Sequence, residues 1–348
     1  MAVAPEVAAS RVRGRWRHRR GFLIVACAAL SLGAAFASAA EPPTSGAAWT
    51  WPDFGDDGSG FKPPPGRWGA LVAYGRELTA RTYAYVGPEV KNPAMRYAGN
   101  NLACRNCHLQ DGTKKYGVPF VGTFAVFPQY VAREGRVVSL EERVNGCMQR
   151  SMNGKPLPLG SREMRAFVAW IRYLSDGVPA GHPPQGRGSA PIPMLDRRAD
   201  PQKGAAVYAE FCAACHQPDG KGRRNGVAGD AKGYAFPPLW GPDSYNVGAG
   251  MARVITAAEF VHGNMPSGAS WDAPVLSAEQ AFDVAAYIDS QPRPSMAGLA
   301  ADYPNRAEKR IDTPYGPYDD AFSADQHKFG PFGPIERARK TAAANDGQ

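Results

Sequence analysis

Residues 104–108 are Cys-Arg-Asn-Cys-His, and residues 212–216 are Cys-Ala-Ala-Cys-His. Both have the C-x-x-C-H spacing typical of covalent haem c attachment, in which two thiols bond the haem and the histidine binds its iron. A structural zinc site would need a second pair of ligands for each motif, and the chain has too few. The residues expected to hold two haem c groups are the four cysteines and two proximal histidines: Cys104, Cys107, His108, Cys212, Cys215 and His216.

The sequence around each motif repeats the same order of expected elements. Each copy begins with a helix, continues through the motif and a long loop, and closes with an amphipathic helix, expected at Ser161 to Ser175 and at Ser277 to Ser290. The 39 glycines and 32 prolines indicate many loops and few long strands. We predict a mainly α-helical protein with two tandem class I cytochrome c domains, long loops and an extended C-terminal arm.

The expected organisation follows from this repeat and from the segments on either side of it. A run rich in proline and glycine separates the two copies, and the last part of the chain has no clear periodicity. The five expected parts are a signal peptide at 1–40, a first cytochrome c domain at 41–180, a linker at 181–196, a second cytochrome c domain at 197–295, and an extended arm at 296–348 whose end is disordered.

Residues 1–40 have the pattern of an export signal, with a basic start, an apolar run and a small-residue cleavage site. We expect a periplasmic protein with no stable membrane span after cleavage; the alternative is that the segment is kept as an inner-membrane anchor. Cleavage removes six arginines and Glu6, so that 40 basic and 32 acidic residues become 34 and 31, a net charge of +3. So small a charge is not a nucleic-acid footprint, and we expect no nucleic-acid partner.

Each haem iron also needs a distal ligand. For the second haem, the run Asn264-Met265-Pro266 lies shortly before the closing helix, where small c-type cytochromes usually have a distal methionine. We expect Met265 to bind the iron, and a Met/His pair would raise the reduction potential of that haem. The alternative is that Met265 packs in the core and His262 binds instead.

One cysteine of the mature chain, Cys147, belongs to neither motif. It is 39 residues after His108, at the place in the repeat where the first distal ligand is expected. Met148 and Met152 compete for that role, and position in the repeat does not choose among the three. A free thiol in an oxidising compartment is reactive unless something holds it, which favours Cys147. A buried, inert cysteine is the alternative.

Basic residues gather near this cysteine in the sequence: Arg133, Arg136, Arg143, Arg150 and Lys155. A helix over residues 140–149 would place Arg143 on the same face as Cys147, one turn earlier. Guanidinium groups bind oxyanions and lower the pKa of a neighbouring thiol. The alternative is a solvated arginine face paired with nearby glutamates. A cysteine, a haem iron and several arginines together indicate redox chemistry on a small sulfur oxyanion.

The chain resembles the thiosulfate dehydrogenases, diheme c-type enzymes that couple two thiosulfates into tetrathionate. The resemblance extends over most of the mature chain. The segments that carry it are NLACRNCH at 101–108, RVNGCMQRSMNG at 143–154, NMP at 264–266 and QHKFGPFGPI at 326–335. The cysteine segment and the last segment are specific, because neither belongs to the general cytochrome c pattern.

The resemblance implies roles for particular residues. The first haem would have a His/Cys axial pair, His108 and Cys147, with the active site beside it formed by Cys147, Arg133 and Arg143. The second haem, with His216 and Met265, would pass electrons onward. Some relatives carry a lysine beside that methionine which replaces it as ligand on reduction. This chain has Asn264 at that position and departs from the pattern.

The resemblance also implies an enzyme: a periplasmic diheme oxidoreductase that joins two thiosulfates into tetrathionate, reversibly in principle, and releases two electrons, one per haem. The expected partners are thiosulfate or tetrathionate and a periplasmic electron acceptor such as a small cytochrome c or an iron–sulfur protein. One alternative is a diheme electron-transfer cytochrome c without its own substrate, which would need no Cys147. Another is a subunit of a carrier-bound sulfur-oxidation system, which would need a partner subunit.

Overall fold

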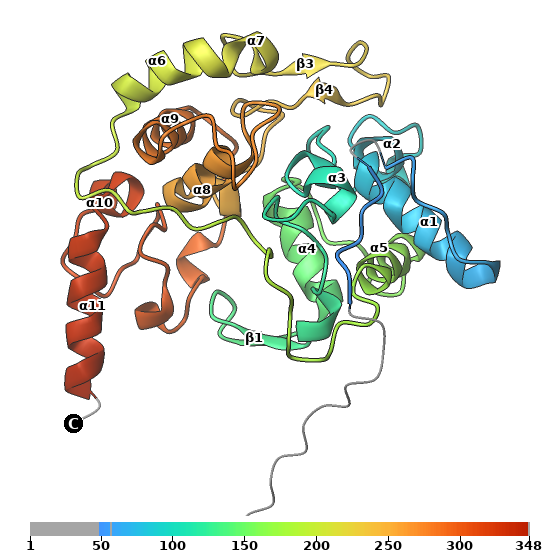
Figure 1. The fold of residues 1–348 in the computed structure, drawn as a ribbon, viewed down its shortest axis with the longest axis horizontal. Helices are drawn as coiled ribbons and strands as arrows, with labels where there is room; N and C mark the ends of the chain where they lie inside the picture. Colours follow the sequence, from blue (N-terminus) through green and yellow to red (C-terminus); the bar gives the residue numbers. More distant parts are fainter. Residues whose placement is uncertain (1–48, 56–57, 347–348) are drawn as a thin grey trace, which may run out of the picture. The chain divides into compact units, whose positions relative to one another are not determined.

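The computed structural model describes residues 49–55 and 58–346 (Figure 1). Its regular elements are mainly helices joined by long loops, with two short antiparallel strand pairs among the described residues. The expected signal peptide at 1–40 lies outside those residues. Within the described part of the chain, no helix is both long enough and apolar enough to cross a membrane.

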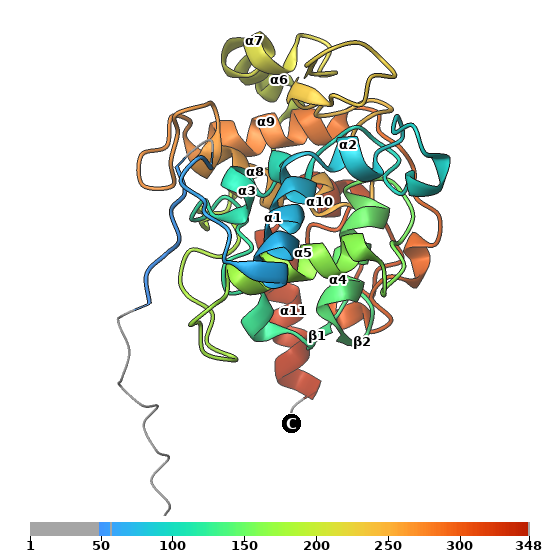
Figure 2. The same cartoon turned by 90° about the vertical axis from the view of Figure 1, so that its right-hand side faces the viewer.

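The first repeat is built on two helices that cross closely. Its helices are α1 (Gly66–Ala80), α2 (Thr82–Val86), the short α3 (Leu109–Gly112), α4 (Leu140–Arg150) and α5 (Arg162–Tyr173). Helices α1 and α5 pack against each other (Figure 2). A Cβ atom on Gly75 of α1 would lie 1.9 Å from the carbonyl oxygen of Ala166 in α5. Only glycine fits this crossing, because any side chain would collide with backbone.

The second repeat has the same crossing. Its helices are α6 (Pro201–Phe211), α7 (Ala213–His216), α8 (Val254–Asn264) and α9 (Ala278–Ser290). Helix α9 packs against both α6 and α8. A Cβ atom on Gly204 of α6 would lie 1.9 Å from the carbonyl oxygen of Asp283 in α9. The opening and closing helices of the two copies therefore meet through equivalent glycines.

The expected closing helices are confirmed, and their starts have a local cause. The Ser161 hydroxyl accepts a hydrogen bond from the Met164 amide at the start of α5, and Ser277 caps α9 in the same way. These bonds satisfy amides that have no partner within the helix. The buried faces include Trp170 of α5 and Phe282 of α9, which are 0% and 1% exposed.

A short hairpin leads into α4. Strands β1 (Gln129–Val131) and β2 (Arg136–Val138) are antiparallel, with Tyr130 opposite Val137. Helix α4 then begins after Ser139, whose side chain forms a capping box with Glu142. The expected helix over residues 140–149 is thus confirmed. In the second repeat, β3 (Arg223–Arg224) pairs with β4 (Tyr234–Phe236).

The C-terminal arm differs from its prediction. The sequence predicted no regular structure over 296–348 and a disordered end, whereas the structure has α10 (Ala324–Phe329) and α11 (Gly333–Asp346). Three apolar residues spaced three apart, Phe329, Phe332 and Ile335, are 7%, 1% and 0% exposed. The two phenylalanines pack into the core of the second repeat, so tertiary burial orders a segment rich in Pro and Gly.

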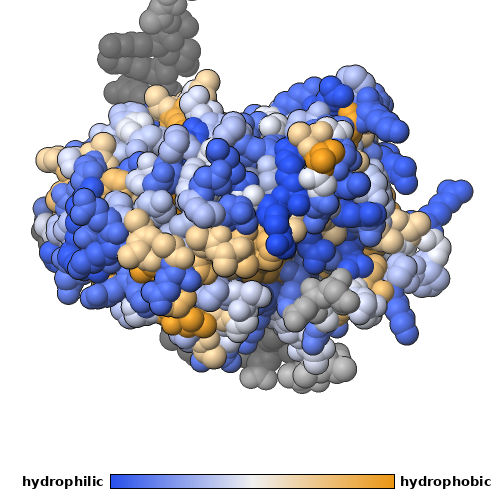
Figure 3. Space-filling view, turned by 90° about the horizontal axis from the view of Figure 1, so that it is seen from above, coloured by the Kyte–Doolittle hydropathy of each residue, from blue (hydrophilic) through white to orange (hydrophobic). Residues whose placement is uncertain are grey.

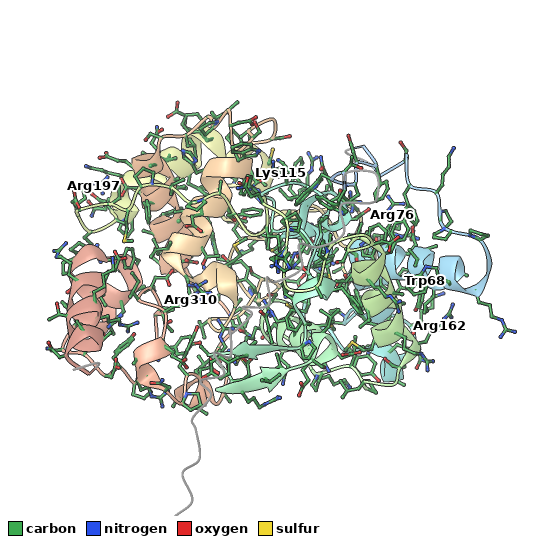
Figure 4. The ribbon with its side chains drawn as sticks, turned by 60° about the horizontal axis from the view of Figure 1, so that its bottom comes forward. Trp68, Arg76, Lys115, Arg162, Arg197 and Arg310 are labelled. Atoms are coloured by element: carbon green, nitrogen blue, oxygen red, sulfur yellow. The ribbon has the colours of Figure 1, made fainter. Side chains whose placement is uncertain are left out.

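The two repeats also share contacts with each other. The Asn100 side chain, completely buried, donates to the carbonyl oxygen of Ser244 at 3.1 Å. The Lys115 ammonium lies 5.5 Å from the centre of the Trp271 ring, and Figure 4 draws Lys115 between the first-repeat helices and those of the second. A loop that follows the first motif therefore meets the loop that follows Met265.

Most of the face drawn in Figure 3 is hydrophilic, with small groups of apolar residues between the polar ones. Two strongly exposed apolar side chains, Val137 at 59% and Val227 at 71%, lie on the β1–β2 hairpin and on the loop between β3 and β4. Isolated exposed apolar residues of this kind are ordinary on a protein surface.

Candidate active site at the first motif

The two C-x-x-C-H motifs have the same local geometry. The Nδ1 atom of His108 is 2.5 Å from the carbonyl oxygen of Val118, and Nδ1 of His216 is 2.8 Å from that of Pro237. A carbonyl oxygen can only accept, so Nδ1 carries the proton and Nε2 is left free to bind a metal. In each motif the histidine amide also donates to the carbonyl of the first cysteine at 2.9 Å.

A cavity lies beside the first motif. Its wall is mostly apolar and contains Cys104, Cys107, His108 and Cys147. Part of that wall comes from the second repeat: Tyr245, Ala249 and Met251. A mostly apolar cavity that presents two thiols beside an imidazole, and a further thiol on α4, fits a covalently attached haem.

The structure brings Cys147 to His108. The cysteine is half-buried on α4, and its thiol is within hydrogen-bond reach of the His108 ring. Arg143, one turn earlier on α4, donates from Nη1 to Sγ of Cys147 at 3.3 Å. The expected i, i+4 pairing of arginine and thiol is therefore present, and the thiol faces the imidazole of the motif.

The surroundings of Cys147 favour its thiolate. Burial alone would raise the pKa of this thiol. The charge of Arg143, the hydrogen bond with His108 and the charges of His108 and Arg133 outweigh burial and lower the pKa to about 6. By contrast, burial raises the pKa of Cys104 to about 12 and that of Cys107 to about 11. The three thiols of the cavity are thus electrostatically different.

The two competing methionines occupy more apolar surroundings. Met148 and Met152 are 2% and 3% exposed and belong to the core cluster that contains Leu157, Met164 and Phe167. Both also line the cavity. The Cys147 thiol, by contrast, has a polar contact with His108. Both methionines are therefore part of the hydrophobic core of the first repeat.

The five basic residues expected near Cys147 divide into two groups. Arg143 and Arg133 act on the thiol, by contact and by charge. Arg136 is exposed and pairs with Glu142 at 2.9 Å, and the Lys155 ammonium lies 5.1 Å from the ring centre of Tyr97. Arg143 is exposed as well, but its partner is the thiol and not a glutamate, so the alternative of a solvated face paired with glutamates describes Arg136 alone.

The fifth basic residue, Arg150, has a partner that the sequence did not indicate. Its Nη2 atom lies 2.7 Å from Oδ1 of Asp302 in the C-terminal arm, and Nε of Arg133 lies 4.0 Å from Oδ2 of the same carboxylate. Nothing in the spacing around Asp302 sets it apart from the other acidic residues of the arm. Its involvement follows only from long-range folding.

At the second motif, Met265 follows the last residue of α8, and its amide donates to the carbonyl of Val261 at 2.8 Å. Its side chain packs against the same core cluster as Cys212. The neighbouring Asn264 is 2% exposed and donates to the carbonyl of Tyr116, in the first repeat, at 3.1 Å. The residue next to the expected ligand is therefore tied to the other domain.

Two family models match the chain. Residues 95–180 match the SoxA/TsdA cytochrome c domain, and residues 201–292 match the cytochrome c family. The chain therefore has two tandem cytochrome c domains and two covalently bound haem c groups, as the two motifs predicted.

Relatives match over most of the chain. The thiosulfate dehydrogenase of Allochromatium vinosum is 42% identical over 236 residues, which cover 66% of this chain and 81% of that protein. That of Stutzerimonas stutzeri is 41% identical over 231 residues, or 66% of this chain and 70% of its own. A solved structure of thiosulfate dehydrogenase (TsdBA) from Marichromatium purpuratum, "as isolated", matches with a TM-score of 0.60 and 34% identity, over 68% of this chain and 50% of that longer chain.

Proposed function

The chain belongs to the thiosulfate dehydrogenases, and we propose that it joins two thiosulfate ions into tetrathionate at the cavity that contains Cys147. The observation that carries this proposal is the position of the Cys147 thiol: it faces His108, accepts a hydrogen bond from Arg143 and has a lowered pKa. A plain electron carrier has no use for such a thiolate.

In this proposal His108 and Cys147 would hold the iron of the first haem, and His216 and Met265 that of the second. When bound, each haem iron accepts one electron, which matches a reaction that releases two. In both histidines the proton lies on Nδ1, so that Nε2 is unprotonated and able to bind iron, which supports the proximal roles. Because this chain has Asn264 where some relatives have lysine, we propose that Met265 stays the ligand in both redox states.

The chain's own residues supply binding and bond formation. Arg143 and Arg133 offset the repulsion between thiosulfate dianions and the Cys147 thiolate. The outer sulfur of the first thiosulfate bonds to Sγ of Cys147, giving a cysteine S-thiosulfonate in a two-electron oxidation for which the two haems would be the electron acceptors. The outer sulfur of the second thiosulfate then attacks the outer sulfur held on Cys147. Tetrathionate leaves and the thiolate is restored, so atoms and charge balance.

The compartment and the acceptor complete the proposal. A basic start, an apolar run and a cleavage site at residues 1–40 support export to the periplasm. Two electrons per cycle must leave the second haem, and the periplasmic acceptor we propose is a small cytochrome c or an iron–sulfur protein.

The test uses purified holoprotein with thiosulfate and ferricyanide, and without a partner protein. We expect tetrathionate from the natural chain and none from Cys147→Ala or Cys147→Gly, with haem content unchanged. Full activity in these variants would contradict the enzyme proposal and favour a diheme electron carrier. Tetrathionate formation only after a partner subunit is added would favour the carrier-bound sulfur-oxidation system.

A further inference from the structure

Two arginines from the first repeat converge on one carboxylate of the C-terminal arm. Arg133 precedes β2 and Arg150 ends α4, yet both reach Asp302, at 4.0 Å and 2.7 Å respectively. The side chains of Arg133, Arg150 and Asp302 are only 17%, 13% and 10% exposed. Pairs so shielded from water hold their geometry better than surface ion pairs do.

The carboxylate is itself held in place. Tyr315 donates from its hydroxyl to Oδ2 of Asp302 at 2.6 Å. Arg306 donates to the backbone carbonyl of Asp302 and to that of Tyr303, the latter at 2.7 Å. Asp302 is therefore fixed through both its side chain and its backbone, and a fixed carboxylate can determine where its arginine partners lie.

Arg133 has further contacts with the same segment. The Tyr303 amide donates to the Arg133 carbonyl at 2.8 Å, and the guanidinium lies 5.8 Å from the Tyr303 ring centre. Nη1 of Arg133 and Nη1 of Arg150 each lie 3.5 Å from the carbonyl oxygen of Gly248. Nε of Arg133 is buried without a hydrogen-bond partner among the described residues. The carboxylate that this nitrogen approaches is that of Asp302, which therefore contributes to holding the guanidinium in place.

This cluster lies next to the reacting thiol. Ser151, the residue after Arg150, lines the cavity that contains Cys147, and so does Ala249, the residue after Gly248, whose carbonyl both arginines approach. A dianionic substrate is bound best by cations that are already in place when it arrives, because no free energy is then lost in ordering them.

We propose that Asp302 is a positioning residue for thiosulfate: it holds Arg133 and Arg150 beside the Cys147 cavity and does not itself touch the substrate. This inference rests on the proposed function. It assigns the C-terminal arm a part in substrate binding, although the arm carries no group that reacts.

The direction in which KM changes distinguishes a positioning role from an effect of charge alone. Asp302→Asn removes a negative charge, and by charge alone thiosulfate would bind more tightly and KM would fall. If Asp302 positions the arginines, KM rises instead. We expect KM for thiosulfate to rise about tenfold while kcat changes less than about threefold, because the reacting thiol is untouched. Steady-state kinetics with ferricyanide measure both constants.

Three companion variants make the test specific. Asp325→Asn removes an exposed carboxylate of the same arm, paired with Arg198 at 3.0 Å, and should leave KM unchanged. Tyr315→Phe removes one anchor of Asp302 and should raise KM about two- to threefold. In an Arg133→Gln background, Asp302→Asn should have a smaller effect than in the natural chain, because residues that act through one another are not additive.

The outcomes are distinct. A KM that is unchanged or lower in Asp302→Asn, with an active natural chain, overturns the positioning role alone. An inactive natural chain overturns the proposed function. If Asp302→Asn does not fold, as judged by haem content and thermal unfolding, Tyr315→Phe decides: a raised KM with unchanged kcat supports the role, and an unchanged KM overturns it.

Discussion

The two haem-binding domains share a scaffold and differ in the residues that we propose as distal ligands. In both, a glycine allows the opening helix to cross the closing helix, and the motif histidine donates from Nδ1 to a backbone carbonyl. In the first, Cys147 lies in the middle of α4 with Arg143 one turn away. In the second, Met265 follows the end of α8 and packs into an apolar core.

The difference shows where reactivity comes from. A backbone frame that orients the proximal histidine is common to both domains, so it cannot decide which haem does chemistry. The first distal side adds a thiolate, nearby cations and a cavity wall contributed by the other domain. The second offers a thioether among apolar side chains, which suits electron transfer.

Cys147→Met would make the first domain resemble the second, and we expect it to cause the largest loss of activity among these variants. A methionine ligand raises the reduction potential of the first haem, and its thioether cannot form the bond to thiosulfate. We expect tetrathionate formation to fall by about 10³-fold or more with both haems retained. Product assays and spectroelectrochemical titration measure the two effects. Activity within tenfold of the natural chain would show that the thiol is not the reaction centre.

Arg143→Gln tests the charge that distinguishes the two distal sides. The arginine donates to Sγ of Cys147. Its loss should therefore raise the pKa of the thiol and lower the affinity for the thiosulfate dianion. We expect kcat/KM for thiosulfate to fall about 100-fold. Arg136→Gln is the matched control, because Arg136 is exposed and pairs with Glu142 instead. Equal losses in the two variants would point to general surface charge.

The shared helix crossing can be tested in both domains. Gly75→Ala and Gly204→Ala each force a methyl group against a backbone carbonyl, and each should lower the free energy of unfolding by about 1–3 kcal/mol. Gly160→Ala and Gly250→Ala are the controls, since a Cβ atom there has no neighbour within 4 Å. Denaturant titrations measure the losses. A loss in only one domain would break the equivalence of the crossings.

The smallest expected effect is a pH-dependent change in stability caused by Glu259 of α8, a residue of the second domain. Burial, helped by the charge of Asp312, raises the pKa of this carboxyl to about 7. The folded state then binds the proton more tightly than the unfolded state, whose pKa is about 4.3, so stability falls as pH rises between these values.

The Glu259→Gln variant should not lose stability in this way as the pH rises, because glutamine does not titrate. We expect the variant to be more stable than the natural chain at pH 8, by about 1 kcal/mol or less after solvent screening, and equally stable below about pH 4. Thermal unfolding at both pH values measures this, with the exposed Glu210→Gln as control. A gain that is the same at both pH values would rule out the titration of Glu259 as its cause.

Features set by neighbouring residues in the chain were predictable, and long-range ones were not. The haem motifs, the closing helices and the Arg143–Cys147 pair depend on spacings of a few residues, so the sequence alone indicates them. Asp302 and Tyr245 reach the first site only through the tertiary fold, and no local pattern marks them. The helix at 333–346 was missed although its Glu, Arg, Lys and Ala residues favour a helix, because the expectation rested on the Pro and Gly residues just before it; those are ordered by the burial of Phe329 and Phe332.

The carbonyl of Gly248, which both Arg133 and Arg150 approach, has a consequence for protein engineering. The first domain, which we propose to be catalytic, contacts this backbone oxygen, and part of its cavity wall consists of Tyr245, Ala249 and Met251 of the second domain. A chimera in which a cytochrome of another reduction potential replaces the second domain would therefore lack part of this cavity wall. An active chimera must keep residues 245–251 of the original chain and may replace only residues of the second domain outside that segment.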